Sequence, residues 1–181
     1  MLHALVFCLV SVCATPPHRL LVTDTVRTRV IPIRPGGGPP PIADSVVIEK
    51  RAHRLTLYHM GRPIKRYLIA LGANPVGDKR QTGDRRTPEG LFSIDSRNPH
   101  SDYYLALHIS YPDSARRAQA EALGLSPGGD IAIHGLGSGR RDVGAFHRTV
   151  DWTDGCIALT NEEMESVWNV VSLGTPVEIK P

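Results

Sequence analysis

The fold is decided by the stretch Val46-Val47-Ile48-Glu49-Lys50, a β-branched, apolar run that is typical of a buried β-strand. Arg51-Ala52 follows as a turn, and His53-Arg54-Leu55-Thr56-Leu57-Tyr58 then alternates between polar and apolar residues. A second turn signal, Met60-Gly61-Arg62, precedes a third strand-like segment from Ile64 to Leu71. Because successive strands joined by short turns pair antiparallel, the stretch predicts a β-meander.

Further strands are expected on the C-terminal side of this meander. Short apolar segments predict strands at Leu91 to Asp95, at Ile131 to His134 and at Pro176 to Ile179. Gly72 to Gly90 is rich in Gly, Pro and charged residues, which predicts a long loop. The 17 Gly and 15 Pro of the chain also favour a fold made of strands and turns.

Two helices are expected among these strands. Asp113 or Ser114 can cap the first, from Ala115 to Leu123, with Gly124 in the position of a C-terminal cap. The second begins with the capping box Thr160-Asn161-Glu162-Glu163, and its apolar face repeats at helical spacing: Met164, Val167, Trp168 and Val171. Gly174 is expected to end it. Together, these strands and helices predict a mostly-β domain with one or two helices, from about residue 44 to residue 181.

Composition excludes several classes of protein. A length of 181 residues predicts one domain, and 41% hydrophobic with 22% charged residues excludes disordered, collagenous and multi-span membrane chains. The net charge of +3 and the absence of a long Lys/Arg run argue against a nucleic-acid partner. The spacings of four histidines match no zinc-ligand pattern, so no metal is expected: His53, His59, His100 and His108.

The N-terminus predicts export. Residues 1–14 are interpreted as a signal peptide, with an apolar segment from Leu5 to Val12 and a cleavage pattern at Val12-Cys13-Ala14. Acylation of Cys13 is an alternative, and the lack of Lys or Arg at the start leaves an upstream start open. Residues 15–43 form a Pro/Gly-rich linker. We expect an exported, periplasmic domain, tethered to the membrane if Cys13 is acylated.

Export would leave Cys156 as the single cysteine of the mature chain. A nucleophilic cysteine needs a neighbouring base and N–H groups that receive a developing oxyanion. The N–H groups of Gly155 and Cys156 are candidates for the latter, and His134 and His147 are both candidates for the base. A buried structural cysteine is the alternative reading of the same residues.

Four segments, in order along the chain, carry a resemblance to a known enzyme family. They are Pro75-Val76-Gly77-Asp78-Lys79; Gly83-Asp84-Arg85-Arg86-Thr87-Pro88-Glu89-Gly90; Ile133-His134-Gly135 with Thr153-Asp154-Gly155-Cys156-Ile157; and Gly174-Thr175-Pro176-Val177-Glu178-Ile179. On these segments the chain resembles the YkuD-type L,D-transpeptidases over about residues 45 to 181. The run Asp-Trp-Thr-x-Gly-Cys-Ile-Ala is similar to a subgroup of that family.

The resemblance implies a YkuD-like β-sandwich of about eight strands, catalysing cysteine acyl transfer on peptidoglycan without a cofactor. Cys156 would attack a tetrapeptide stem, release D-Ala and hold the acyl group as a thioester. A diaminopimelate amine of a second stem would then resolve the thioester and form a 3→3 cross-link. His134 would be the general base and acid, oriented by the backbone carbonyl of Gly135, with Gly155 in the oxyanion hole. Five residues near the cysteine would bind substrate: His147, Arg148, Trp152, Thr153 and Asp154.

Two departures from the family pattern bear on the site. Asp154 stands where many members have a second histidine, which favours His134 as the base. Ala158 stands where many members have an arginine, so another cation is expected to bind the substrate carboxylate: Arg85, Arg86, Arg140, Arg141 or Arg148. His147 is interpreted either as a wall of the active site or as a structural residue. Trp152 stacks on substrate or anchors the core.

The acceptor is left open by the sequence. An L,D-carboxypeptidase, or an enzyme that attaches or detaches an envelope lipoprotein, would use the same site. A non-catalytic cell-wall binding module is a more remote alternative. The expected partners are peptidoglycan stem peptides and, for one alternative, an envelope lipoprotein; we expect a monomer.

Overall fold

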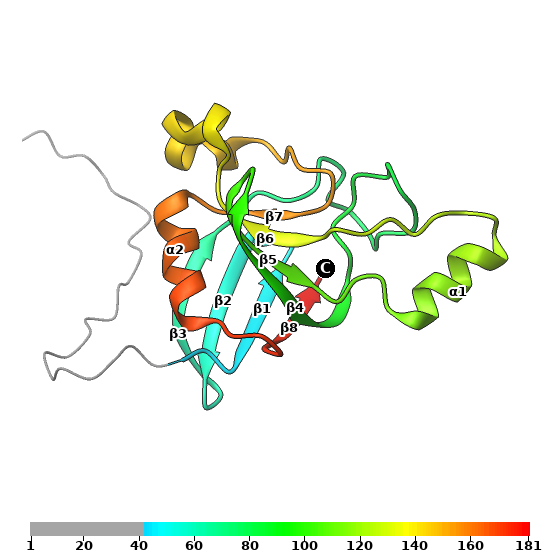
Figure 1. Cartoon of the computed structure of the whole chain (residues 1–181), viewed down its shortest axis with the longest axis horizontal. Helices are drawn as coiled ribbons and strands as arrows, with labels where there is room; N and C mark the ends of the chain where they lie inside the picture. Colours follow the sequence, from blue (N-terminus) through cyan, green and yellow to red (C-terminus); the bar gives the residue numbers. More distant parts are fainter. Residues whose placement is uncertain (1–41) are drawn as a thin grey trace, which may run out of the picture. The chain divides into compact units, whose positions relative to one another are not determined.

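The structure is a computed structural model, and it describes residues 42–181 (Figure 1). The predicted signal peptide at residues 1–14 lies outside the described residues, as does the linker except for its last two residues. The catalytic domain expected from residue 44 onward falls within them. Between residues 42 and 181, no helix is both long and apolar enough to cross a membrane.

The domain is built on one mixed sheet of eight strands. In chain order the strands are β1 (Ser45–Glu49), β2 (Arg54–His59), β3 (Arg62–Leu68), β4 (Gly90–Ser101), β5 (Tyr104–Ile109), β6 (Ala132–His134), β7 (Ile157–Ala158) and β8 (Pro176–Lys180). Their order across the sheet is β3-β2-β1-β8-β4-β5-β6-β7. The expected mostly-β fold of about eight strands is therefore confirmed, and so is the antiparallel pairing of β1, β2 and β3.

The sheet curls because β4 belongs to both of its halves. The start of β4 pairs with β8, and from Ile94 onward it pairs with β5, with register shifts that bend the strand. Beyond β3, Ala70 bridges Ala158 of β7, so the two outer strands of the sheet approach one another. The two faces expected of a sandwich are thus formed by one continuous sheet.

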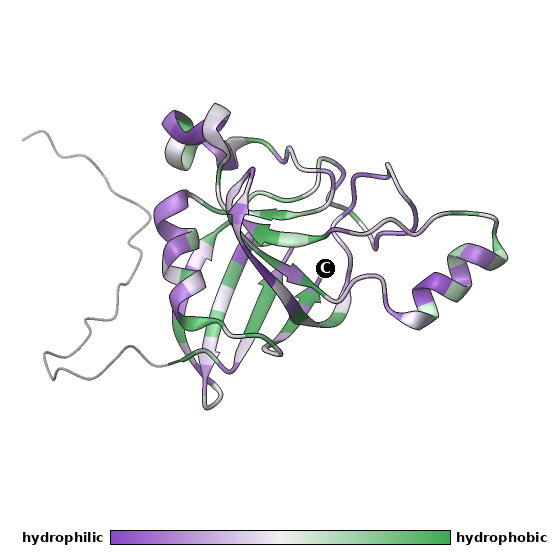
Figure 2. Ribbon diagram, viewed as in Figure 1, coloured by the Kyte–Doolittle hydropathy of each residue, from purple (hydrophilic) through white to green (hydrophobic). Residues whose placement is uncertain are grey.

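The core lies inside this curl. Alternate residues of the central strands are 2% exposed or less: Val46, Ile48, Leu55, Leu57, Val177 and Ile179. Most of the residues between them are partly exposed, as expected for strands with one buried face, but Thr56 of β2 is buried as well. Figure 2 shows the same contrast, with hydrophobic stretches on the strands and mostly hydrophilic colours on the helices. Burial of each such side chain stabilises the fold by roughly 1.5–3 kcal/mol.

Three helices connect the strands within residues 42–181, whereas the sequence predicted one or two. Helix α1 (Ser114–Ala122) is capped by Asp113 and stands away from the sheet, and α2 (Asn161–Val170) begins with the predicted Thr160 capping box (Figure 1). The helical segment that the sequence did not predict is η1 (Ser138–Thr149), a 3₁₀ segment with a break at Gly144. Two glycines, Gly139 and Gly144, and the lack of an apolar repeat explain why the sequence does not predict a helix there.

Candidate active site

The pairing of β6 with β7 brings the segments that carry His134 and Cys156 side by side. The two strands are parallel, with Ile133 opposite Ile157 and His134 opposite Ala158. Cys156 directly precedes β7, two residues before Ala158. The predicted nucleophile therefore stands at the start of the strand that pairs with the strand carrying one predicted base.

The imidazole of His134 is held in one tautomer. Its Nδ1 lies 2.7 Å from the carbonyl oxygen of Gly135, and because a carbonyl only accepts, Nδ1 carries the proton. Nε2 is therefore the atom with a free lone pair. Burial lowers the pKa of His134 to about 4, against the opposing effect of the Gly135 hydrogen bond. The ring is neutral at neutral pH and can accept a proton, as a general base must.

The main chain after His134 is fixed by the first residue of α2. The side-chain oxygen of Asn161 accepts a hydrogen bond from the N–H of Leu136 at 2.7 Å. A Cβ at Gly135 would lie 2.7 Å from that oxygen, so only glycine fits there. Asn161 therefore positions the carbonyl that orients His134. The sequence marked Asn161 only as part of the capping box, because the contact spans 25 residues of chain.

The thiol of Cys156 is partly exposed, and its hydrogen bond goes to the backbone carbonyl of Asp130 at 3.4 Å. Within residues 42–181 no hydrogen bond joins the thiol to His134. Burial raises the pKa of Cys156 above its ordinary value, with the N–H of Ala132 acting in the opposite direction. Both partners are therefore neutral in this state, and the thiol must turn away from Asp130 to reach the imidazole.

Asp130 is a site residue that the sequence did not reveal. Its φ of +54° lies in the left-handed region, which a non-glycine residue occupies at a cost in conformational energy. This backbone conformation belongs to the residue whose carbonyl receives the Cys156 thiol. Aspartate enters the left-handed region more readily than most non-glycine residues, but nothing in the sequence connects position 130 with the cysteine 26 residues later.

The turn before Cys156 is closed by the hydroxyl of Thr153. This hydroxyl accepts from the N–H of Gly155 at 3.1 Å and donates to the carbonyl of Cys156 at 2.8 Å. The N–H of Gly155, expected in the oxyanion hole, is thus engaged inside the turn. The N–H of Cys156, the other expected donor, has no acceptor among residues 42–181. Thr153 is buried and holds the turn, whereas the sequence suggested a contact with substrate.

Gly155 is required by a close approach of the loop from Gly72 to Gly90. Its φ is +131°, and a Cβ there would lie 2.6 Å from the carbonyl oxygen of Arg86. A Cβ at Gly72 would in turn lie 3.1 Å from the Cα of Gly155. The loop therefore packs directly beneath the residue that precedes the cysteine.

The residues that form the Pro75–Lys79 and Gly83–Gly90 motifs hold this loop in shape. Burial alone would raise the pKa of Asp84, but the ammonium of Lys79 and three backbone N–H groups lower it to about 2. Lys50 reaches in from the end of β1, and its Nζ lies 2.6 Å from the Gly77 oxygen and 2.8 Å from Glu89. The hydroxyl of Thr87, fully buried, accepts from the N–H of Gly72 at 3.0 Å. These residues build a platform for the cysteine turn.

Aromatic rings surround the imidazole. The Trp152 ring lies edge-on to His134 with centroids 6.0 Å apart, and Arg140 lies 4.4 Å above the Trp152 ring. The ring of Tyr103, at the tip of the β4–β5 hairpin, lies closer, 4.5 Å from that of His134. Tyr103 could not be predicted from the sequence, because no pattern links the hairpin to the strand that carries His134.

The other expected substrate-binding residues take different places. His147 is 3% exposed, and neither ring nitrogen has a partner within residues 42–181. Burial, helped by Arg148, lowers the pKa of His147 to about 4. Arg148 pairs with Glu163 of α2 and so anchors η1. Asp154 is exposed, with an oxygen 3.5 Å from Nε of Arg85.

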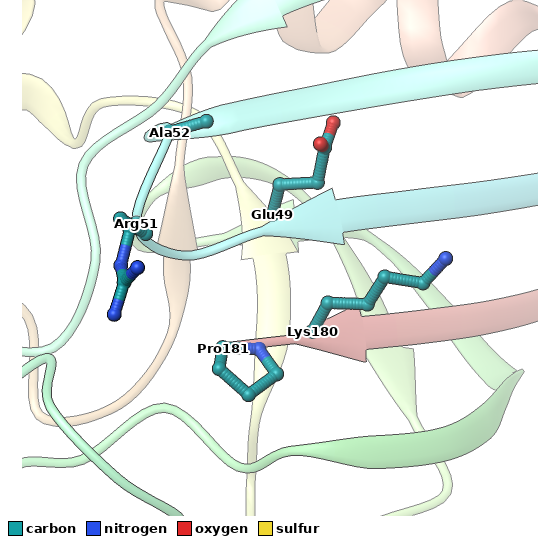
Figure 3. A pocket seen from close by; sticks show the side chains of 5 residues that line it. All are labelled: Glu49, Arg51, Ala52, Lys180 and Pro181. Carbon is teal, nitrogen blue, oxygen red and sulfur yellow. The ribbon is translucent and has the colours of Figure 1, made fainter.

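The remaining polar groups and surface hollows lie apart from the cysteine site. In residues 42–181 no group of three His, Cys, Asp or Glu side chains is placed to hold a metal ion. A pocket of 390 Å³ lies at the ends of β1 and β8, lined by Glu49, Arg51, Ala52, Lys180 and Pro181 (Figure 3). None of its residues belongs to the cysteine site.

Comparison with known proteins identifies the family of this chain. The model of the YkuD L,D-transpeptidase catalytic domain matches residues 43–179, and the chain belongs to this family. It is 28% identical over 133 residues to a protein of Escherichia coli strain K12 named "Putative L,D-transpeptidase YafK". That match covers 70% of this chain and 46% of YafK, so the chain spans less than half the length of this relative.

Solved structures share the fold. The helical cell shape determining protein Pgp2 of Campylobacter jejuni superposes with a TM-score of 0.59 and 27% identity, over 78% of this chain and 49% of Pgp2. An L,D-transpeptidase of Mycobacterium smegmatis gives a TM-score of 0.51 at 15% identity, over 77% of this chain and 59% of that protein. At that identity the second likeness concerns the fold alone.

Proposed function

We propose that this domain is a peptidoglycan L,D-transpeptidase in which Cys156 is the nucleophile and His134 the general base and acid. The observation that supports the proposal is the β6–β7 pairing, which joins the strand ending in His134 to the strand that directly follows Cys156, together with the Nδ1 hydrogen bond that leaves Nε2 of His134 free. Membership of the L,D-transpeptidase family supports stem peptides as the substrate class.

In the first half-reaction the thiol donates its proton to Nε2 of His134 as sulfur attacks the stem carbonyl. The attacked bond joins the L-centre of diaminopimelate to the terminal D-Ala. The N–H of Cys156, free of other acceptors within residues 42–181, would donate to the developing oxyanion. His134 then returns the proton to the leaving amine, so D-Ala departs and a thioester remains.

In the second half-reaction an amine of another stem attacks the thioester. His134 accepts a proton from this amine, the carbon–sulfur bond breaks, and the thiol regains its proton. The product is a 3→3 cross-link. Water as the acceptor would make the same site a carboxypeptidase, and a lipoprotein amine would make it a ligase.

A buried, neutral imidazole suits this cycle. Because the pKa of His134 is about 4 and that of Cys156 is raised, the pair rests as thiol and imidazole, with no ion pair between them. Proton transfer therefore accompanies attack. Of the candidate cations for the substrate carboxylate we favour Arg140, because it lies over the ring of Trp152, which in turn meets the imidazole of His134. Arg148 is paired with Glu163, and Arg85 contacts Asp154.

Incubation of the domain with sacculi, followed by muropeptide analysis, tests the reaction. Dimers joined 3→3 are expected, whereas tripeptides alone would indicate a carboxypeptidase and released protein an amidase. Cys156→Ser should abolish every product, because a serine hydroxyl stays protonated beside this base. A carbapenem adduct in the intact mass of wild type, absent from the variant, is the matching control. An adduct that survives the substitution would refute the nucleophile.

The two histidines are separated by the same adduct. His134→Ala should slow acylation at least about a hundredfold, the usual scale for a lost general base. His147→Ala should do less, because its ring sits in η1 and has no hydrogen bond within residues 42–181 that directs it toward sulfur. The reverse ranking would assign the base to His147.

Export is part of the proposal. N-terminal sequencing of protein from the envelope fraction should find a start near Thr15, or an acylated Cys13. Full-length protein confined to the cytosol would remove both the compartment and the substrate. The name of Pgp2, a cell shape determining protein, supports a role at the cell wall for this chain.

A further inference from the structure

The tip of the β4–β5 hairpin rests on the chain that follows His134. A Cβ at Gly135 would lie 3.1 Å from the carbonyl oxygen of Tyr103, and one at Gly137 would lie 2.6 Å from that of Asp102. The N–H of Tyr103 donates to the hydroxyl of Ser101 at 3.1 Å, which tightens the turn. Because Gly135 and Gly137 have no side chains, the backbone of the hairpin tip can pack directly against them.

This docking places the Tyr103 ring over the imidazole. The two ring centroids are 4.5 Å apart and the planes meet at 37°. Tyr103 is 45% exposed whereas His134 is 3% exposed, so the tyrosine ring has solvent on one side and the imidazole on the other. Trp152 meets the imidazole from another direction, edge-on at 71°.

We propose that Tyr103 is the positioning residue of His134: its ring covers the imidazole, fixes the ring plane against Trp152 and keeps water from Nε2. This inference rests on the proposed role of His134 as the base. The hydrogen bond to Gly135 fixes one nitrogen but leaves a torsion that is intrinsically broad for histidine. Packing from two rings removes that freedom, and a base must be held closely to act at full rate.

The ring, not the hydroxyl, performs this role. Within residues 42–181 the Tyr103 hydroxyl makes no hydrogen bond, so phenylalanine should substitute for it. Coverage of the imidazole by the Tyr103 ring is consistent with the low pKa of His134, because burial is the main cause of that low value. The other titratable groups that act on this imidazole are His108 on β5 and His147 on η1, and both stay in place when Tyr103 is changed.

The test combines titration with kinetics on the full chain. The pKa of His134 is measured by NMR, and the rate of Cys156 acylation by a carbapenem is measured against carbapenem concentration, in wild type, Tyr103→Phe, Tyr103→Leu and Tyr103→Ala. His100→Ala, which truncates an exposed side chain of the same hairpin, is the matched control. Tyr103→Leu keeps an apolar side chain at the hairpin tip and replaces the alanine variant in the test if that variant proves unstable.

Tyr103→Ala should raise the pKa of His134 from about 4 toward 6.5 and lower the maximal acylation rate about tenfold or more at unchanged half-saturation. Tyr103→Phe and His100→Ala should match wild type, and Tyr103→Leu should fall between. An unchanged His134 pKa and rate in Tyr103→Ala would overturn the inference while leaving the proposed function intact. If the pKa of His134 shifts in Tyr103→Ala but wild type forms no carbapenem adduct, the result supports the contact between the two rings and counts against the proposed function.

Discussion

Mild acid should destabilise this domain before its paired carboxylates titrate. The perturbation is a fall in pH from 7 to 4. The unfolded chain takes up a proton on each imidazole as the pH falls through 6.5, but the folded His134 does not until about pH 4. Between these values the unfolded state binds more protons, so the free energy of unfolding decreases as the pH falls.

The magnitude follows from the pKa of that one buried side chain. A folded-state pKa of about 4 against an ordinary value of 6.5 corresponds to about 3 kcal/mol, present above pH 6.5 and lost by pH 4. His147, whose pKa is lowered in the same way, adds a loss of the same sign. Asp84 acts in a separate window, since its pKa of about 2 delays its loss to the range from 3.8 to 2.

Urea unfolding followed by tryptophan fluorescence, repeated from pH 7.5 to 3.5, measures this loss. His134→Gln should lose about 3 kcal/mol less stability between pH 6.5 and 4 than wild type does. His100→Gln, which changes an exposed imidazole, should keep the wild-type pH dependence. Identical pH dependence in His134→Gln and wild type would refute the claim that His134 is buried in its neutral form.

Three further substitutions test the framework of the site by thermal or urea unfolding and by carbapenem acylation. Gly155→Ala should lower the free energy of unfolding by about 1–3 kcal/mol and slow acylation, because its Cβ would lie 2.6 Å from a carbonyl oxygen. Gly139→Ala, with open space around the added Cβ, should do neither. Lys50→Met should cost about 3 kcal/mol by leaving buried acceptors unpaired, whereas Lys180→Met, at an exposed pair, should cost under 1 kcal/mol. Asn161→Ala should lower the free energy of unfolding by about 1–3 kcal/mol, because the backbone N–H of Leu136 loses its acceptor. Asn161→Asp keeps a side-chain oxygen and should recover most of this stability. Equal losses in both variants would contradict the role of the side-chain oxygen.

Local features of the fold were predictable from the sequence. Alternation of apolar residues located β1 and β2 to within a residue, and the capping box at Thr160 located the start of α2. β5 was missed as an element, although it lies in the middle of the sheet order. The length of β4 was also missed, because bulges after Ile94 interrupt the alternation that marks a strand.

The site was predictable only where a motif spans few residues. The neighbourhood of Gly155 and Cys156 could be inferred, as could the His134-Gly135 turn, because each is local. Contacts made across the fold could not be inferred, and they set the details: the carbonyl of Asp130 that accepts the thiol and the ring of Tyr103 over the imidazole. One sequence has no period or spacing that encodes a contact between distant segments.

The position of β8 has a consequence for how the chain reaches this structure. The last strand lies in the interior of the sheet, between β1 and β4, and Val46 near the start of the domain pairs with Val177 near its end. Loops of this length close slowly, and the central hydrogen bonds of the sheet cannot form until β8 is available. A ribosome-bound chain that still lacks Pro176–Lys180 therefore has no complete core to bury. The domain is expected to stay unfolded until Pro176–Lys180 has left the ribosome and to acquire protease resistance only then.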